Sequence, residues 1–161
     1  MNLNLIQNSI RQPADKIQNS SEGFTLIEIL ISLGIFGFIT GLGLFVSLDF
    51  YKSYTLNSER ILLVSLLVNA RNYSITNINE SRHGIYLKTD EYVIFQGDSY
   101  ASRNPIYDES FKVNSLITNT GLTEILFDQL TGQPNVTGNI MLSNGVKSSI
   151  IFIQNEGRIT W

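Results

Sequence analysis

The chain has 161 residues, a formal net charge of −3 and no cysteine. This length provides for one domain and an anchor. The acidic balance excludes a broad electrostatic footprint for nucleic acid, and the lack of cysteine excludes disulfides, thiol chemistry and cysteine metal sites.

A polar N-terminal stretch, residues 1–22, precedes an apolar run from Phe24 to Leu48 whose one charged residue is Glu28. A secretory signal has a basic start, a shorter apolar core and a small-residue cleavage site, so this region does not read as one. About 20 apolar residues suffice for a helix to cross a bilayer, and the run therefore predicts a membrane-spanning helix. An acid at the centre of such a helix costs about 2.5–3.5 kcal/mol on insertion scales, so Glu28 needs a dedicated partner.

The sequence Gly23-Phe24-Thr25-Leu26-Ile27-Glu28 lies directly between the polar leader and the apolar run. These residues closely resemble the class III signal of type IV pilins and type II secretion pseudopilins. In that family a prepilin peptidase cuts after the glycine and methylates the new amine. The resemblance implies cleavage between Gly23 and Phe24, and an N-methylated Phe24.

The resemblance also divides the chain. It implies a cleaved leader at 1–23, a transmembrane and assembly helix at 24–50, and a periplasmic or extracellular domain at 51–161. The protein is then a single-pass protein of the bacterial inner membrane with a cytoplasmic N-terminus. The implied partners are prepilin peptidase, other pilins or pseudopilins, an inner-membrane assembly platform and membrane lipid.

The spacing of Phe24 and Glu28 supports an assembly role. Residues four apart share a helix face, and a helix N-terminus favours negative charge. We expect the Glu28 carboxylate of one subunit to pair with the Phe24 amine of a neighbour and fix the axial register of a filament. The alternative is a Glu28 solvated by lipid headgroups. Gly37 and Gly41 form a Gly-x-x-x-Gly spacing, which allows close approach of helices in lipid.

The helix is predicted to continue over residues 51–78, where its apolar residues repeat at helical spacing. The expected buried face consists of Leu56, Leu63, Leu66, Leu67, Ala70 and Tyr73. The charged residues of this segment are expected elsewhere on the surface; they are Lys52, Glu59, Arg60 and Arg71.

The remainder, 82–161, reads as a β-domain, because short apolar or alternating runs are separated by turn residues. The predicted strands are His83–Lys88, Tyr92–Gln96, Leu122–Phe127, Gly138–Leu142, Val146–Ile153 and Arg158–Trp161. Asn144-Gly145 is the clearest tight hairpin, and residues 97–110 are expected to form an irregular surface loop. The predicted fold is α+β and pilin-like, with a long N-terminal helix packed on antiparallel sheets.

Weaker similarities extend along the domain. The Ala70-Arg71 stretch, the pattern from Phe127 to Gly132, and the terminal Gly157-Arg158 are similar to the H-type minor pseudopilin branch (GspH/FimT). This similarity implies a low-abundance component and not the major filament subunit.

The sequence contains no catalytic motif, so we predict a structural protein with no enzyme activity, no cofactor and no metal site. His83 is the one histidine, which excludes a His–His metal pair and most catalytic triads. It is expected to be structural, at a helix-to-strand corner. The acid pairs Asp90-Glu91 and Asp108-Glu109 are expected to be solvated turn acids, with weak Ca²⁺ binding as the alternative.

The leading hypothesis is a minor pseudopilin or minor pilin, a structural and assembly component of a type II secretion pseudopilus or a type IV pilus. The alternative is a DNA-uptake or adhesive minor pilin. Some members of the H-type branch bind DNA through a C-terminal Gly-Arg-x-Arg element, of which this chain keeps Gly157-Arg158 and has Thr160 in the last place. Arg158 and Trp161 are the candidate DNA contacts, by charge and stacking. The competing interpretation is a strand-edge arginine and a core tryptophan.

Overall fold

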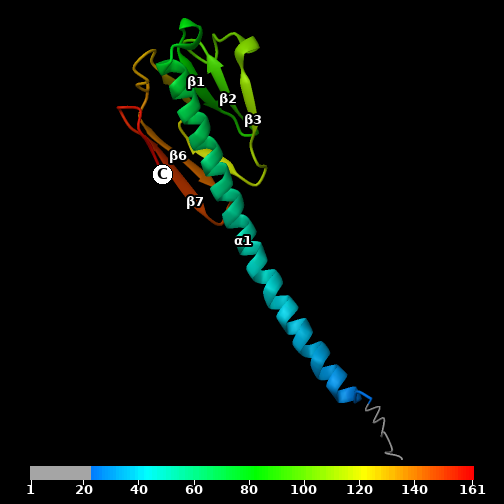
Figure 1. The fold of residues 1–161 in the computed structure, drawn as a ribbon. Coiled ribbons are helices and arrows are strands. Elements are labelled where there is room, and N and C mark those ends of the chain that lie inside the picture. The colour runs from blue at the N-terminus through cyan, green and yellow to red at the C-terminus, as the bar shows by residue number, and fades with distance from the viewer. Residues whose placement is uncertain (1–22) are drawn as a thin grey trace, which may run out of the picture. The chain divides into compact units, whose positions relative to one another are not determined.

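The computed structural model describes residues 23–161, and Figure 1 shows the order of its elements. A 50-residue helix, α1 (Leu26–Ile75), comes first. It is followed by the 3-10 helices η2 (Ile78–Glu80) and η3 (Pro105–Tyr107) and by the strands β1 (His83–Leu87), β2 (Glu91–Gln96), β3 (Glu109–Lys112), β4 (Thr118–Gly121), β5 (Glu124–Phe127), β6 (Gly138–Ser143), β7 (Ser148–Ile153) and β8 (Ile159–Thr160). The predicted α+β class, with a long N-terminal helix on antiparallel sheets, is confirmed. The predicted leader lies outside the described residues except for Gly23.

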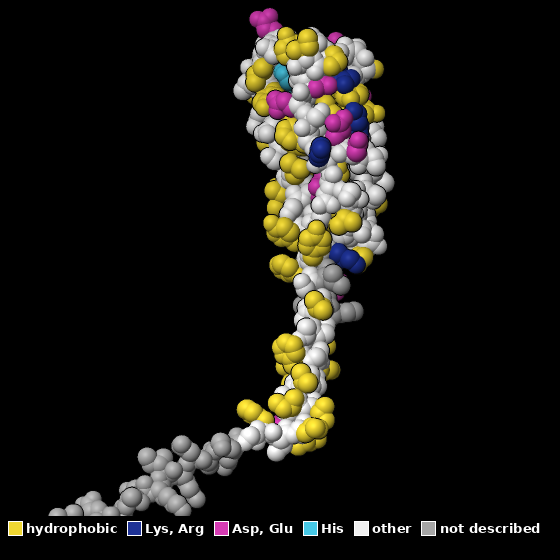
Figure 2. Space-filling view, turned by 90° about the vertical axis from the view of Figure 1, so that its right-hand side faces the viewer, with side chains coloured by type: hydrophobic (Ala, Val, Ile, Leu, Met, Phe, Trp, Pro, Cys, Tyr) yellow, Lys and Arg dark blue, Asp and Glu magenta, His cyan; other side chains and the backbone are white. Residues whose placement is uncertain are grey.

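The chain divides into two compact units, one ending at Gly41 and one spanning Leu42–Trp161. In the first unit every described residue is exposed. The most apolar window of α1 is long enough to cross a membrane, and none of it is buried within the protein. On the face drawn in Figure 2, hydrophobic side chains follow one another along this apolar part of the helix.

In the second unit α1 buries one face. Leu63, Leu67 and Ala70 are fully buried, and Leu56 and Leu66 are nearly so. Spacings of three and four residues bring these side chains to one side of the helix. The predicted buried face is therefore confirmed, with Tyr73 partly buried at its end.

Sheet A has the strand order β3-β2-β1-β5 and is antiparallel throughout. Its register sets Ile85 opposite both Ile94 and Ile125. Because side chains alternate between the faces of a strand, these three isoleucines lie on one face, and all three belong to the main core.

Sheet B has the order β4-β6-β7-β8 and is also antiparallel. The predicted Asn144-Gly145 hairpin joins β6 to β7, and Ile140 pairs with Ile151 across it. The inward residues of both sheets and the buried face of α1 form a single hydrophobic cluster. The second unit is therefore held together by residues far apart in sequence.

The C-terminal end of α1 is tied to two glycine turns. Arg71 Nε donates to the carbonyl of Gly132 (3.1 Å), and Arg71 Nη2 donates to the carbonyl of Glu156 (3.3 Å). Gly157 has φ +73°, and a Cβ there would lie 2.3 Å from the Gly132 carbonyl oxygen. Only glycine fits so close an approach at that backbone angle.

Several boundaries and two strands differ from the prediction. β3 and β4 were not predicted, because their residues are charged or polar and mostly exposed. They are edge strands that form by pairing with β2 and β6. The alternation of hydrophobic and polar residues within a strand's own sequence does not predict such pairing. The predicted strands start or end one to two residues away from the observed ones, within the usual uncertainty of element ends.

Three further expectations about single positions need correction. α1 ends at Ile75, and left-handed φ angles at Asn77 and Asn79 stop it short of residue 78. Glu59 was expected on the surface but is 5% exposed, because it lies on the buried side of α1. Trp161 is 62% exposed, so the interpretation of a core tryptophan is wrong.

Candidate processing and assembly site

The start of α1 is fixed by a side-chain cap. Thr25 Oγ1 accepts a hydrogen bond from the backbone N–H of Glu28 (3.3 Å). A threonine N-cap with a glutamate three residues later is the capping-box spacing, which satisfies N–H groups left free at a helix start. The cap places Gly23 and Phe24 ahead of the first turn, in non-helical backbone.

The Gly23–Phe24 peptide is open to solvent. Phe24 is 80% exposed, and a Cβ added at Gly23 would meet nothing within 4 Å. The predicted cleavage position therefore lies in an exposed, non-helical segment immediately before a capped helix. Exposed chain outside regular structure is where proteolytic cleavage concentrates.

The Glu28 carboxylate lies in the first turn of α1 and is exposed. None of the ion pairs in the described part of the chain involves it. The positive end of the helix dipole favours a carboxylate there, and the structure leaves this one available to a group from outside the chain.

Gly37 and Gly41, the two glycines predicted to allow close helix packing, also face open space. A Cβ at either position would meet nothing within 4 Å. Within residues 23–161 no other segment packs against these two glycines.

The second unit does not gather a metal-binding cluster from its described residues. No three His, Asp or Glu side chains come within metal-binding reach there. Glu91 pairs with Lys88, and Asp108 pairs with Arg103 (2.8 Å). These two acids are therefore held by cations, and the other members of the two pairs, Asp90 and Glu109, have no cationic partner in the described chain.

His83 is the first residue of β1, near the corner that follows α1, as the sequence predicted. It is 5% exposed, and its Nδ1 lies 3.1 Å from the Ser81 carbonyl oxygen. Burial lowers the pKa of the imidazole, against smaller opposing effects of Ser81 and Glu109. A neutral ring whose Nδ1–H donates to a carbonyl leaves Nε2 as an acceptor.

The candidate DNA contacts lie at the end of the second unit. Arg158 Nε donates to Gln154 Oε1 (2.6 Å), which engages part of its guanidinium group. Trp161 follows β8 and has an exposed ring. These two residues flank the two-residue strand β8, Arg158 before it and Trp161 after it.

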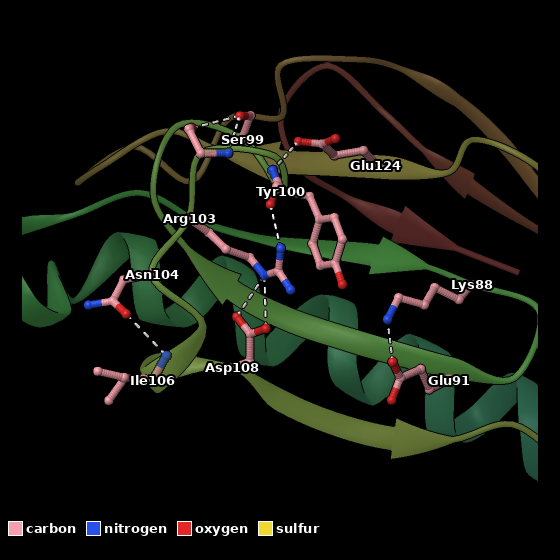
Figure 3. A network of polar contacts seen from close by, with 10 residues as sticks. Lys88, Glu91, Ser99, Tyr100, Arg103, Asn104, Ile106, Asp108 and Glu124 are labelled. Carbon is pink, nitrogen blue, oxygen red and sulfur yellow. Dashed lines mark hydrogen bonds and ion pairs between the residues drawn. The ribbon is translucent and has the colours of Figure 1, made fainter.

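The loop between β2 and β3 is ordered by a polar network that sequence reasoning missed (Figure 3). The Arg103 guanidinium lies 3.5 Å from the centre of the Tyr100 ring, and that ring stacks on Tyr86 at 4.0 Å. Arg103 Nη1 donates to the Tyr100 carbonyl, and Glu124 Oε1 accepts from the Tyr100 N–H. These contacts join residues from two strands and a loop. A pattern within one stretch of sequence therefore does not predict them.

Comparison with known proteins agrees with the N-terminal geometry. Residues 18–44 match the family model described as the prokaryotic N-terminal methylation motif. No curated protein and no solved structure gives a significant match to the chain. The motif implies processing by prepilin peptidase and assembly with other pilins, and it supports a membrane-anchored protein of the type IV pilin or pseudopilin type.

Proposed function

We propose that this chain is a minor pseudopilin or minor pilin, cleaved between Gly23 and Phe24 and built into a short filament of a type II secretion or type IV pilus machine. The observation that carries the proposal is the combination of an exposed Gly23–Phe24 peptide, a capped helix start and an exposed Glu28 without an ion-pair partner in the described chain. Cleavage turns Phe24 into a terminal ammonium one helical turn from Glu28. The C-terminal domain then lies on the periplasmic or outer side.

The pairing across subunits follows from the electrostatics of a lipid or helix-bundle environment. A lone carboxylate at low dielectric is expensive unless it is paired. A neighbour's Phe24 ammonium supplies the opposite charge and sets one axial register. Each subunit offers both groups, so the pairing can repeat along a filament.

An exposed apolar stripe on α1 supports contacts beyond the membrane. Phe50, Tyr54, Ile61 and Val68 are 72%, 64%, 57% and 39% exposed. Their spacings of four, seven and seven residues bring them to one side of the helix, away from the buried face. Apolar stripes of this kind mark protein contact surfaces, and in a filament they pack against neighbouring subunits.

The assignment to the H-type minor branch is also part of the proposal. Its degenerate sequence features, Arg71, Gly132 and Gly157, come together at the end of α1. The contacts among these three residues in this chain support the proposed assignment.

The processing step has a direct test. The full chain is coexpressed with a prepilin peptidase, and its intact mass is measured. The expected mass lacks residues 1–23 and carries one added methyl group. Gly23→Val blocks the loss, whereas the matched Gly43→Val inside the helix does not. An unchanged mass beside a peptidase that cleaves a control pilin contradicts the proposal.

A DNA-uptake pilin is the second candidate, favoured by the exposed ring of Trp161, three residues after Arg158 in the sequence. Ring stacking and a cation together bind single-stranded nucleic acid. The test is a gel shift with the full chain at two salt concentrations, with Arg158→Ala and Trp161→Ala as variants. Binding that is absent, or that both variants retain, removes this candidate.

A further inference from the structure

A hollow of about 410 Å³ lies at one end of sheet A, between η2, η3 and the last turns of α1. Tyr73, Ile78, Asn79, His83, Ile94, Gln96, Ile106, Tyr107, Asp108 and Glu109 line it. Small-molecule and side-chain sites combine apolar walls with a few convergent polar groups, and this hollow has both.

The apolar residues at the rim of the hollow are strongly exposed. Ile106 is 84% exposed, the highest value among the large hydrophobic side chains of the described residues. Tyr107 is 52% and Ile78 is 40% exposed. Exposed apolar side chains at the rim of a hollow lose their contact with water when a ligand covers them, which stabilises a complex.

The loop holds these rim residues in place. Asn104 Oδ1 accepts from the Ile106 N–H (3.2 Å), and both carboxylate oxygens of Asp108 accept from Arg103 Nε (3.0 and 2.8 Å). Figure 3 shows these contacts on either side of the Ile106 turn. The side chains of Arg103 and Asp108 are only 18% and 14% exposed. The rim is therefore ordered before any ligand arrives, which reduces the entropy lost on binding.

Several polar groups that line the hollow can accept a hydrogen bond. The neutral His83 ring offers Nε2, since Nδ1 is engaged by Ser81. Asn79 Nδ2 donates to Gln96 Oε1 (2.9 Å), which leaves the Asn79 carbonyl oxygen as a further acceptor. No lysine or arginine lines the hollow.

Glu109 gives the hollow its net charge. Asp108 is neutralised by Arg103, whereas Glu109 takes part in none of the ion pairs of the described chain. It lines the hollow together with Tyr73 and His83. Burial and then the Glu109 charge raise the pKa of Tyr73, and the same charge partly offsets the lowering of the His83 pKa by burial. An unpaired carboxylate among acceptors attracts a cationic donor.

We propose that this hollow binds a basic side chain, Lys or Arg, of an extended partner peptide, with a neighbouring apolar residue of that peptide seated on Ile106 and Tyr107. The apolar stem of the basic residue lies along Ile78, and its cationic end meets Glu109 and the acceptors of His83 and Asn79. Long basic side chains combine an apolar stem with a charged head in this way. The site is independent of processing at Gly23, so it stands or falls separately from the proposed filament role.

The test uses the single histidine of the chain as its reporter. The full chain is placed in lipid nanodiscs at about pH 7.5, one unit above the ordinary histidine pKa, and the imidazole NMR signal is followed. The probes are acetyl-Leu-Lys-amide, the neutral acetyl-Leu-norleucine-amide and the acidic acetyl-Leu-Glu-amide. We expect a saturable shift with the lysine probe and an affinity about tenfold or more weaker for the other two.

Matched variants locate the site. Glu109→Gln should remove the preference for lysine, whereas Glu156→Gln, an exposed acid in the turn before β8, should keep it. Ile106→Ser should weaken all three probes, whereas Leu116→Ser, also exposed but outside the hollow, should not. Because Ile106 is 84% exposed, Ile106→Ser should fold normally. It therefore tests the site even if Glu109→Gln does not fold. No saturable shift with the lysine probe, equal shifts with all three probes, or equal losses in variants and controls overturn the proposal.

Discussion

α1 meets its surroundings in opposite ways in the two units of the chain. Up to Gly41 every described side chain is exposed, including the apolar ones and the carboxylate of Glu28. From Leu42 onward the same helix buries one face in a core shared with two sheets, and there it buries a different carboxylate, Glu59. The second unit buries a hydrophobic core within its own chain, whereas the described residues of the first unit bury none of their apolar side chains.

The largest expected effect comes from the buried face of α1. Leu67→Ala should destabilise the second unit (Leu42–Trp161) by about 2–5 kcal/mol, because it removes a fully buried side chain and leaves a cavity. The matched change Leu33→Ala, at a residue of the first unit that is 62% exposed, should leave the stability of the second unit within about 0.5 kcal/mol. Chemical denaturation of the full chain in nanodiscs, followed by the fluorescence of Trp161, measures both. Equal losses contradict the division into a packed and an unpacked part of α1.

A smaller loss of stability is expected at Gly132, in a turn that packs against the C-terminal end of α1. Gly132 has φ +64°, and a Cβ there would lie 2.6 Å from the Ile75 side chain. Gly132→Ala should therefore cost about 1–3 kcal/mol, through backbone strain and crowding. Gly145→Ala is the control: it shares a positive φ but meets nothing within 4 Å. A Gly132 variant no less stable than the Gly145 variant contradicts the role of this close approach.

The third effect depends on pH and concerns Glu59. Its Oε1 has no hydrogen-bond partner in the structure, and its Oε2 accepts only a long bond from the Asn114 N–H (3.4 Å). Burial raises the pKa of this carboxyl, against the smaller effects of Asn114 and Tyr92. A raised pKa means that the folded protein binds the proton more tightly than the unfolded chain. The stabilisation is complete below the ordinary value of 4.5 and is lost as the pH rises through the folded pKa.

Glu59→Gln should consequently raise the melting temperature at pH 7 to 8, and the gain should shrink as the pH falls toward 4. Glu91→Gln is a control of opposite sign, since the hydrogen bond from Lys88 is the main cause that lowers the pKa of Glu91. Thermal melts across this pH range measure the two variants. A gain for Glu59→Gln that does not change with pH rules out burial of the ionised form as the cause.

The sequence predicted those features that depend on residues close together in the chain. The membrane-length run, the buried stripe from Leu56 to Ala70 and the Asn144-Gly145 hairpin each have a local pattern of hydrophobicity or turn residues. The Thr25 cap was missed although its signal, threonine three residues before Glu28, was present.

The features that the sequence did not predict all depend on long-range pairing. β3 and β4 have no hydrophobic alternation of their own and form because β2 and β6 lie beside them. Glu59 was expected on the surface because a charge seldom lies on a buried face. The ordered loop around Arg103 and the hollow beside Glu109 require several segments to converge, which no single stretch of sequence encodes.

The measurement that tests the filament proposal most directly is the incorporation of a Glu28→Leu variant. In cells that make the filament machine, this variant should still lose its leader, because the change lies beyond the cleaved bond, but it should be missing from purified filaments. Glu156→Leu, which removes an exposed acid from the second unit, serves as the matched control and should be incorporated normally. Filaments that contain the Glu28→Leu subunit at the wild-type level would show that no neighbouring Phe24 ammonium depends on this carboxylate, and the account of assembly would be wrong.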